Sequence, residues 1–423
     1  MLRPGILLLL LAFLPVPIAL AVDFDPAATA TNQLGLELFR SFAAKNPGQD
    51  LLLSPYSIQS ALAMTYAGAD GQTRTEMARA LHYPDNEAPL VASFGALRAA
   101  FDEAVTKSKE MADRANSNGG PIEPIDLRVA NFLFGQRGYA FRDSFLAVTK
   151  GAYDATFEQL DFRADAGAAR QIINRWVEVQ TQQKIRDLIP ADGVTARTRL
   201  VLVNAIYFKA PWTSPFTKSF TEDRPFFVHG TEPKNIPTMR QQSYLGYASF
   251  ADFSAIALPY GYYSDDFQFL ILLPNAATSL PTLTAKLTPA ILHECAQLHV
   301  SSLILFLPKF RIAGPTLSLG ETLQSFGMKS AFDQPRGSAN FDRLAPRKPD
   351  DYLGISDVFH KTFLALDEDG TEAAAATAVA LGTFGVASHS PPPEIHVDRP
   401  FLFAIQHRPS GTCLFLGCVT DPR

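Results

Sequence analysis

Cysteine is scarce in this chain of 423 residues, which has only Cys295, Cys413 and Cys418. An odd number of cysteines cannot all pair within one chain, so the sequence excludes a fold held together by a disulfide framework. The last two cysteines fall in or beside the apolar run 414–419, and their offset of five places them on opposite faces of a strand. We therefore expect three buried free thiols.

Neither sign of charge is in large excess. The 37 Lys and Arg residues nearly balance the 42 Asp and Glu residues, which gives a net charge of -5. This balance offers no electrostatic reason to expect nucleic acid or an anionic membrane as a partner.

Familiar catalytic motifs are missing as well. The chain has no Gly-x-Ser-x-Gly elbow, no Gly-x-x-x-x-Gly-Lys phosphate loop and no Gly-x-Gly-x-x-Gly dinucleotide turn. His293, Glu294, Cys295 and His299 resemble a metal cluster, but Gln297 stands where the zinc-protease spacing requires the second histidine. No Ser, His and Asp set has a recognisable catalytic context. We expect no metal site, no cofactor and no enzymatic activity.

The apolar run near the start of the chain is too short for a membrane anchor. A spanning helix needs about 20 apolar residues, whereas residues 6–14 are followed at once by Pro15 and Pro17. A basic residue precedes the run, and small residues follow it up to Ala21. This is the pattern of a secretory signal peptide over residues 1–21, and it predicts a secreted protein, either extracellular or periplasmic.

Helical patterns dominate the first part of the chain and strand patterns the later part. Residues 34–42 carry an apolar side chain at every fourth position, and Ser54 with Pro55 supplies a cap and a first turn for a second helix. Residues 88–114 form a third helical pattern. Apolar strand-like runs follow at residues 200–208, 267–273, 303–307, 362–366 and 401–405. This order, without internal repeats, predicts a mixed α+β fold of several antiparallel sheets.

The most informative segment is residues 366–393. After a turn-like Asp-Glu-Asp-Gly come Thr371, Glu372 and the small residues Ala373 to Ala376, and there is no proline until Pro391. Every second residue from Thr371 to Leu381 is uncharged, and the only charge, Glu372, has the opposite parity. Such a segment can be exposed in one state and a central strand in another. An alanine run also favours helix, and the composition alone equally allows a linker.

Four separated motifs resemble those of the serpin family, and together they cover nearly the whole chain after residue 21. They are Leu-Ser-Pro-Tyr-Ser-Ile at 53–58, Val-Asn-Ala-Ile-Tyr-Phe-Lys at 203–209 with Trp212 and Phe216, the stretch from His360 and Lys361 to the alanines after Glu372, and Val-Asp-Arg-Pro-Phe-Leu-Phe at 397–403. The resemblance implies a single serpin domain over residues 22–423, with about eight or nine helices, three β-sheets and an exposed reactive-centre loop at about 370–393.

The resemblance also assigns site residues. It places the hinge of the loop at Glu368, Gly370, Thr371, Glu372, Ala373, Ala374, Ala375, Ala376 and Thr377. It places the region where the main sheet opens at Ser54, Pro55, Ser57, Asn204, Trp212 and His360. Ala210 and Pro211 depart from the family pattern, so the resemblance leaves the local geometry there open.

Resemblance to inhibitory serpins implies a suicide mechanism. A protease serine attacks the loop to give an acyl-enzyme, and the freed loop inserts into the main sheet and traps the enzyme. The family's usual count of fourteen residues from Gly370 places the scissile bond between Phe384 and Gly385. An aromatic residue at that position suits a chymotrypsin-like or subtilisin-like protease. The loop after it is long for the family, so Leu381 stays open as a competing cleavage position.

Other members of the family leave two alternatives open. One is a non-inhibitory serpin, such as a ligand carrier, chaperone or storage protein. The other is an inhibitor of a cysteine protease. Non-inhibitory relatives tend to carry bulky or charged hinge residues, and this hinge has only Glu372. The resemblance implies a monomer capable of loop-sheet polymerisation. It does not indicate heparin-type activation, because Lys107, Lys109 and Arg114 alternate with acidic residues.

Overall fold

The computed structural model describes residues 24–117, 119–120, 122–228, 232–262, 264–349, 351–372 and 391–422. The predicted signal peptide lies outside the described residues. So do the hinge residues 373–377 and the predicted scissile bond at Phe384 and Gly385. The described residues form nine α-helices and three β-sheets of nine, six and two strands. The fold is therefore mixed α+β, as the sequence predicts.

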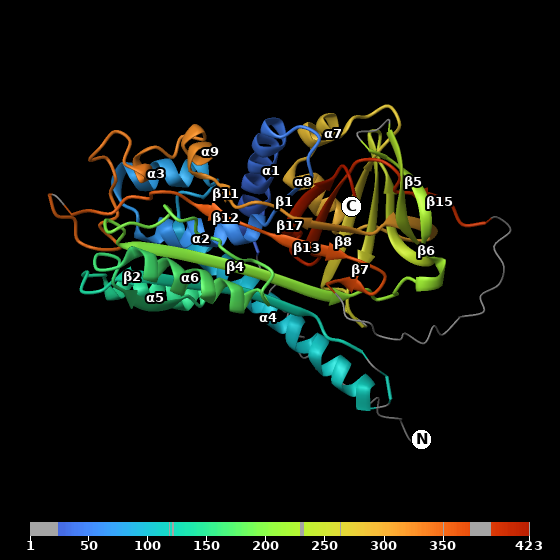
Figure 1. The fold of residues 1–423 in the computed structure, drawn as a ribbon, viewed down its shortest axis with the longest axis horizontal. Coiled ribbons are helices and arrows are strands. Elements are labelled where there is room, and N and C mark those ends of the chain that lie inside the picture. Colours follow the sequence, from blue (N-terminus) through green and yellow to red (C-terminus); the bar gives the residue numbers. More distant parts are fainter. Residues whose placement is uncertain are drawn as a thin grey trace, which may run out of the picture.

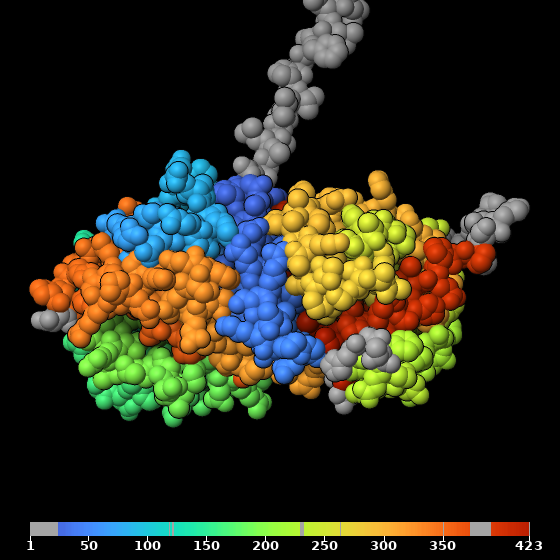
Figure 2. Space-filling model, turned by 90° about the horizontal axis from the view of Figure 1, so that it is seen from above, coloured from blue at the N-terminus to red at the C-terminus, as the bar shows by residue number. Residues whose placement is uncertain are grey.

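The helices lie mainly in the first half of the chain. They are α1 (Ala27–Lys45), α2 (Pro55–Gly68), α3 (Gly71–Ala80), α4 (Glu87–Ser117), α5 (Asp143–Tyr153), α6 (Ala166–Gln180), α7 (Leu280–Lys286), α8 (Pro289–Cys295) and α9 (Gly320–Ser325). Helix α2 begins as predicted, because the Ser54 hydroxyl accepts the backbone N–H of Ser57 at 3.3 Å and Pro55 occupies the first turn. Figure 2 shows α1 as a blue band between the yellow segment that carries α7 and α8 and the segments that carry α3 and α9. No described helix is long and apolar enough to cross a membrane.

The nine-stranded sheet forms most of the core. Its strands are β1 (Leu51–Leu53), β17 (Thr412–Val419), β16 (Phe401–His407), β8 (Phe267–Pro274), β7 (Phe253–Pro259), β6 (Glu232–Ser249), β9 (Val300–Pro308) and β15 (Glu394–His396), with β5 (Glu222–Val228) paired to β6. Every residue of β8, β16 and β17 is buried. These strands read as continuous apolar runs because both of their faces are covered. The three cysteines are free and buried, so this prediction is confirmed.

The six-stranded sheet carries the candidate site. Its order is β10 (Phe310–Ala313), β13 (Phe363–Leu366), β14 (Gly370–Thr371), β4 (Leu200–Pro211), β2 (Asp126–Gln136) and β3 (Thr156–Leu160). The small sheet pairs β11 (Leu317–Ser318) with β12 (Phe359–His360). In Figure 1, α2 and α6 lie on either side of the long strand β4. Pairing is mostly antiparallel, as predicted, except that β2 with β3 and β9 with β15 are parallel.

Candidate functional site

The two halves of the six-stranded sheet are joined by the two-residue strand β14. Gly370 pairs with Pro211 and Thr371 with Ala210 of β4, while Thr371 also pairs with Leu366 of β13. Within the described part of the chain, the other ten residues of β4, 200–209, have no strand partner on that side. The sheet is therefore bridged at one end and open along the rest of β4.

Gly370 is required by the close approach of two backbones. A Cβ atom at this position would lie 2.1 Å from the carbonyl oxygen of Ala210 and 2.8 Å from Cα of Pro211. Only glycine can bring the hinge this close to β4. The departure from the family pattern at Ala210 and Pro211 is thus compatible with strand pairing, and the carbonyl of Pro211 accepts the N–H of Gly261 at 2.8 Å.

Thr371 is the innermost residue of the described hinge. Its side chain is fully buried, and its hydroxyl is hydrogen-bonded to the hydroxyl of Tyr260 at 2.5 Å. The Tyr260 ring stacks on Trp212, with centroids 4.6 Å apart, and the Trp212 indole donates to the carbonyl of Asp367 at 2.9 Å. Thr371 is therefore already packed against the Tyr260 side chain, which stacks on Trp212, while the loop is uncleaved.

Glu368 anchors the turn between β13 and β14. Its buried carboxylate accepts hydrogen bonds from Lys309 Nζ and from the Thr221 hydroxyl, both at 2.8 Å. Burial acts to raise its pKa, but these hydrogen bonds outweigh that effect and hold the pKa of Glu368 below its usual value. The neighbouring Asp369 pairs at 2.8 Å with Lys218, whose side chain is exposed. The hinge is thus fixed by charged partners from outside its own strand pair.

Glu372 ends the described hinge in a left-handed conformation, with φ of 53°. Its N–H donates to the carbonyl of Ala365 at 2.9 Å, and its carboxylate, only 3% exposed, lies 3.3 Å from Lys184 Nζ. Burial raises the pKa of Glu372 despite the attraction of Lys184. Burial, and then the nearby Glu372 carboxylate, raises the pKa of Tyr207 as well. Glu372 is therefore a buried carboxylate whose ion pair with Lys184 only partly offsets its desolvation.

A second polar cluster lies where α2 begins, beside Asn204 near the middle of β4. The backbone N–H of Ser54 donates to Nε2 of His360 at 3.0 Å, and the Ser54 hydroxyl donates to the carbonyl of Leu414 at 2.6 Å. The Ser57 hydroxyl donates to the side-chain oxygen of Asn204, whose amide donates to Asn131. Burial lowers the pKa of His360 to about 4, so the imidazole is neutral at pH 7 with its proton on Nδ1.

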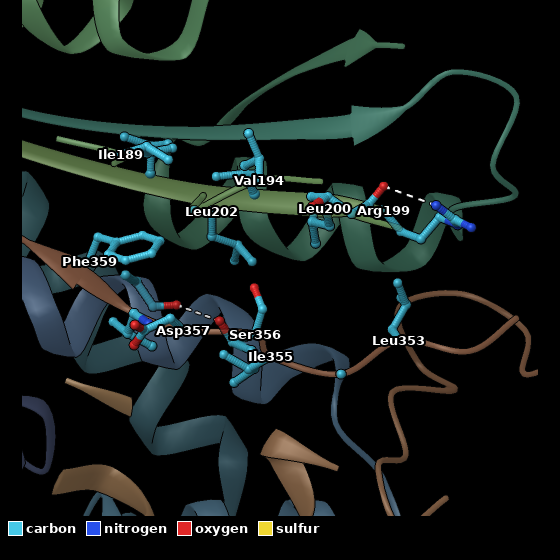
Figure 3. A pocket seen from close by; sticks show the side chains of 18 of the residues that line it. Ile189, Val194, Arg199, Leu200, Leu202, Leu353, Ile355, Ser356, Asp357 and Phe359 are labelled. Atoms are coloured by element: carbon cyan, nitrogen blue, oxygen red, sulfur yellow. Dashed lines mark hydrogen bonds between the residues drawn. The ribbon is translucent and has the colours of Figure 1, made fainter. Parts of the chain in front are cut away.

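A cavity of about 230 Å³ separates β4 from the segment that leads into β12. Leu200 and Leu202 of β4 face Ile355 and Phe359 across it, as Figure 3 shows. Ser57 of α2 also lines this cavity. The cavity lies beside residues 200–204 of β4, which have no strand partner on that side among the described residues.

The predicted opening residues form two groups in the structure. Ser54, Pro55, Ser57, Asn204 and His360 come together around the start of α2. Trp212 lies instead just beyond the opposite end of β4, beside Asp367 and Thr371.

The sequence does not indicate the partners of these residues, which are Lys309, Thr221, Tyr260, Lys184 and Asn131. They come from elements far from the hinge in sequence, and local patterns around them carry no signal of the contact. His293 and Cys295 lie on α8, and no group of three or more metal-binding side chains occurs among the described residues.

Comparisons with known proteins agree with this architecture. The family model described as "Serpin (serine protease inhibitor)" matches residues 29–422. The leukocyte elastase inhibitor of Equus caballus is 33% identical over 405 residues, covering 94% of this chain and 100% of that protein. Native protease nexin-1 with heparin superimposes with a TM-score of 0.79 at 25% identity, over 95% of this chain and 100% of that chain. Human thyroxine-binding globulin complexed with thyroxine superimposes with a TM-score of 0.76 at 29% identity, over 94% of this chain and 99% of that chain. The chain belongs to the serpin family.

Proposed function

We propose that this chain inhibits serine proteases by inserting its reactive-centre loop between β4 and β13 after cleavage. The observation that carries the proposal is β14, the two-residue strand that already bridges the sheet beside ten unpaired residues of β4. Extending the register of Gly370 with Pro211 and Thr371 with Ala210 sets residues 372–381 against residues 209–200. Ten residues beginning at Glu372 would thus suffice to pair the whole open edge.

Side-chain sizes along this extended register support insertion. Ala373, Ala374 and Ala375 fall opposite Phe208, Tyr207 and Ile206, so small residues would meet large ones. Thr377 falls opposite Asn204, where its hydroxyl could join the polar cluster. A central strand without a charge or proline after Glu372 fits a sheet that is covered on both faces.

The proposed chemistry begins as ordinary proteolysis. The hydroxyl oxygen of the protease serine attacks the carbonyl carbon of Phe384, its proton passes through the protease histidine, and the amine of Gly385 leaves. The loop, now held to the enzyme by an ester, inserts and carries the acyl group along the sheet. The thirteen steps along the chain from Thr371 to Phe384 span about 43 Å at roughly 3.3 Å per residue. A protease displaced this far is pulled against the inhibitor body, and its distorted active site no longer hydrolyses the ester.

One experiment tests this function directly. The chain lacking residues 1–21 is mixed with chymotrypsin, a subtilisin, trypsin and elastase, and adducts that survive SDS are resolved on a gel. We expect an adduct with chymotrypsin or subtilisin and, by mass spectrometry, a cut after Phe384. Cleavage without an adduct by all four proteases would reject the proposal and favour a carrier role, since the structurally similar thyroxine-binding globulin is complexed with thyroxine.

We also propose that the chain is exported after removal of residues 1–21. The pattern that supports this is the short apolar run with its small-residue exit at Ala21. Mass spectrometry of the protein recovered from culture medium should find Val22 at the amino terminus. Recovery of the uncut chain from cells alone would contradict export.

A further inference from the structure

An aromatic ring with a cation on it lies on the nine-stranded sheet, beside the strand that follows the loop. The Phe306 ring of β9 stacks on the imidazole of His396 in β15, with centroids 4.3 Å apart and planes 6° from parallel. The guanidinium of Arg224 in β5 lies 4.2 Å from the centroid of the same ring. These three residues, together with Phe220 and Arg240, are called here the sheet-edge cluster.

Arg240 is the cation of the cluster that remains free for a partner. Its guanidinium lies 5.7 Å from the Phe306 centroid and 6.0 Å from that of Phe220, a ring that is 53% exposed. Arg224 is paired with Glu222, and His396 with Glu394 at 3.1 Å. Among the described residues, no carboxylate lies within ion-pair distance of Arg240. Both ring centroids lie within about 6 Å, the range of cation–π contacts, and neither ring neutralises the guanidinium.

The cluster lies next to the loop in the chain. Strand β15 begins at Glu394, directly after the three prolines that end the loop, and the carbonyl of Pro393 accepts the N–H of Ile304 in β9 at 3.0 Å. Residues 373–393 contain no Asp, Glu, Lys or Arg. At the other side of the loop, Lys309, Lys218 and Lys184 are each paired with a hinge carboxylate. Beyond Glu372, the loop therefore contributes no formal charge of its own to the encounter with a protease.

We infer that the sheet-edge cluster is a secondary contact surface for an acidic patch on the protease that the loop engages. This inference rests on the proposed inhibitory function. A guanidinium that has no ion-pair partner among the described residues, next to an uncharged bait, would attract a protease whose surface beside its active site carries carboxylates. Such a contact accelerates the encounter with proteases that carry a negatively charged surface patch. The loop sequence determines which residue enters the specificity pocket.

The test compares variants of Arg240 against two forms of one protease. The probes are chymotrypsin and chymotrypsin whose lysines have been succinylated, so that its surface carries additional carboxylates. Arg240→Gln removes the charge, Arg240→Lys keeps it, and Arg137→Gln makes the same charge change at an exposed position beside the far end of β4. The second-order rate of inhibition and the yield of SDS-stable adduct are measured for each pair.

We expect Arg240→Gln to inhibit the succinylated protease about threefold to tenfold more slowly at low salt, with the difference lost near 1 M salt. The adduct yield should be unchanged, and Arg240→Lys and Arg137→Gln should behave like the unaltered chain. Equal rates for Arg240→Gln and the unaltered chain would overturn the contact while leaving inhibition intact. Failure of the unaltered chain to form any adduct would overturn the inhibitory function, and the contact with it.

Discussion

The backbone N–H of Ser54 donates a 3.0 Å hydrogen bond to Nε2 of His360, joining two residues 306 positions apart in the sequence. The bond connects the start of α2 to β12 at the edge of the sheet opening. Because the acceptor is an imidazole nitrogen, the bond exists only while His360 is neutral. Protonation of a single side chain would therefore loosen the contact at this edge.

Stability should fall on acidification because of this histidine. Burial lowers the pKa of His360 to about 4, whereas the unfolded value is about 6.5. Between these values the unfolded chain binds a proton that the folded chain excludes, so stability is present above pH 6.5 and is lost as the pH falls towards 4. For a shift of this size, the loss at pH 5 is about 2 kcal/mol. Burial lowers the pKa of His407 to about 4 as well, so that residue adds to the loss.

The measurement is the urea midpoint at pH 7.5 and pH 5.0, followed by tryptophan fluorescence. His360→Gln provides the comparison, because its side-chain oxygen can still accept the N–H of Ser54 but cannot gain a proton. We expect the variant to lose less stability between the two pH values than the unaltered chain. An equal loss in both proteins would show that His360 does not carry this part of the pH dependence.

Removing the cation from Glu368 should open the sheet at the hinge. Lys309→Ala leaves a carboxylate buried with only the Thr221 hydroxyl as a side-chain donor, which costs about 1–3 kcal/mol. We expect faster formation of loop-sheet polymers on mild heating, seen as a ladder on a native gel. Lys218→Ala serves as the control, because Lys218 is 58% exposed and its ion pair contributes little.

Exchanging the two charged residues tests whether the Lys309–Glu368 ion pair, and not a general change in packing, controls polymerisation. Lys309→Glu combined with Glu368→Lys should polymerise more slowly than either single variant, since the opposite charges can meet again. If Lys309→Ala polymerised no faster than Lys218→Ala, the hinge would not depend on this contact.

The sequence reveals the elements of the site better than their partners. Ser54 and Pro55 predict the start of α2 because a capping hydroxyl and a proline act within one turn. Gly370 marks the end of the turn for an equally local reason. The bond between Tyr260 and Thr371 joins residues 111 positions apart, and nothing in the sequence around Tyr260 indicates it. Contacts of this kind depend on the pairing of whole sheets, which local periodicity does not encode.

The open edge of β4 is a second feature that local sequence patterns do not predict. An apolar run at 200–208 predicts a strand covered on both faces, and β4 is such a strand over most of its length. The run gives no sign that one edge lacks a partner, because strand pairing uses backbone groups that all residues share. The expectation that the main sheet opens beside this strand comes from the resemblance to serpins. The register of β14 locates the unpaired edge at residues 200–209.

A charge at Thr371 should separate cleavage from trapping. Thr371 is fully buried against Tyr260, so Thr371→Arg would place an unpaired cation in an apolar socket and expel the hinge from the sheet. We expect the variant to be cleaved at an undiminished rate but to form no SDS-stable adduct. Thr371→Ser keeps a hydroxyl for Tyr260 and should still trap the protease. Retained trapping by Thr371→Arg would reject insertion at β14 as the first step.

The identity of the bait residue can be tested by changing the charge of its side chain. Phe384→Arg should turn the chain from an inhibitor of chymotrypsin into an inhibitor of trypsin, because the trypsin pocket carries a carboxylate at its base. The rate with chymotrypsin should fall by at least about a hundredfold, equivalent to losing roughly 3 kcal/mol of transition-state binding. Leu381→Arg is the matched variant, since it introduces the same side chain three residues earlier. If Leu381→Arg changed the target and Phe384→Arg did not, the scissile bond would follow Leu381, and the loop would insert three fewer residues before the protease is stopped.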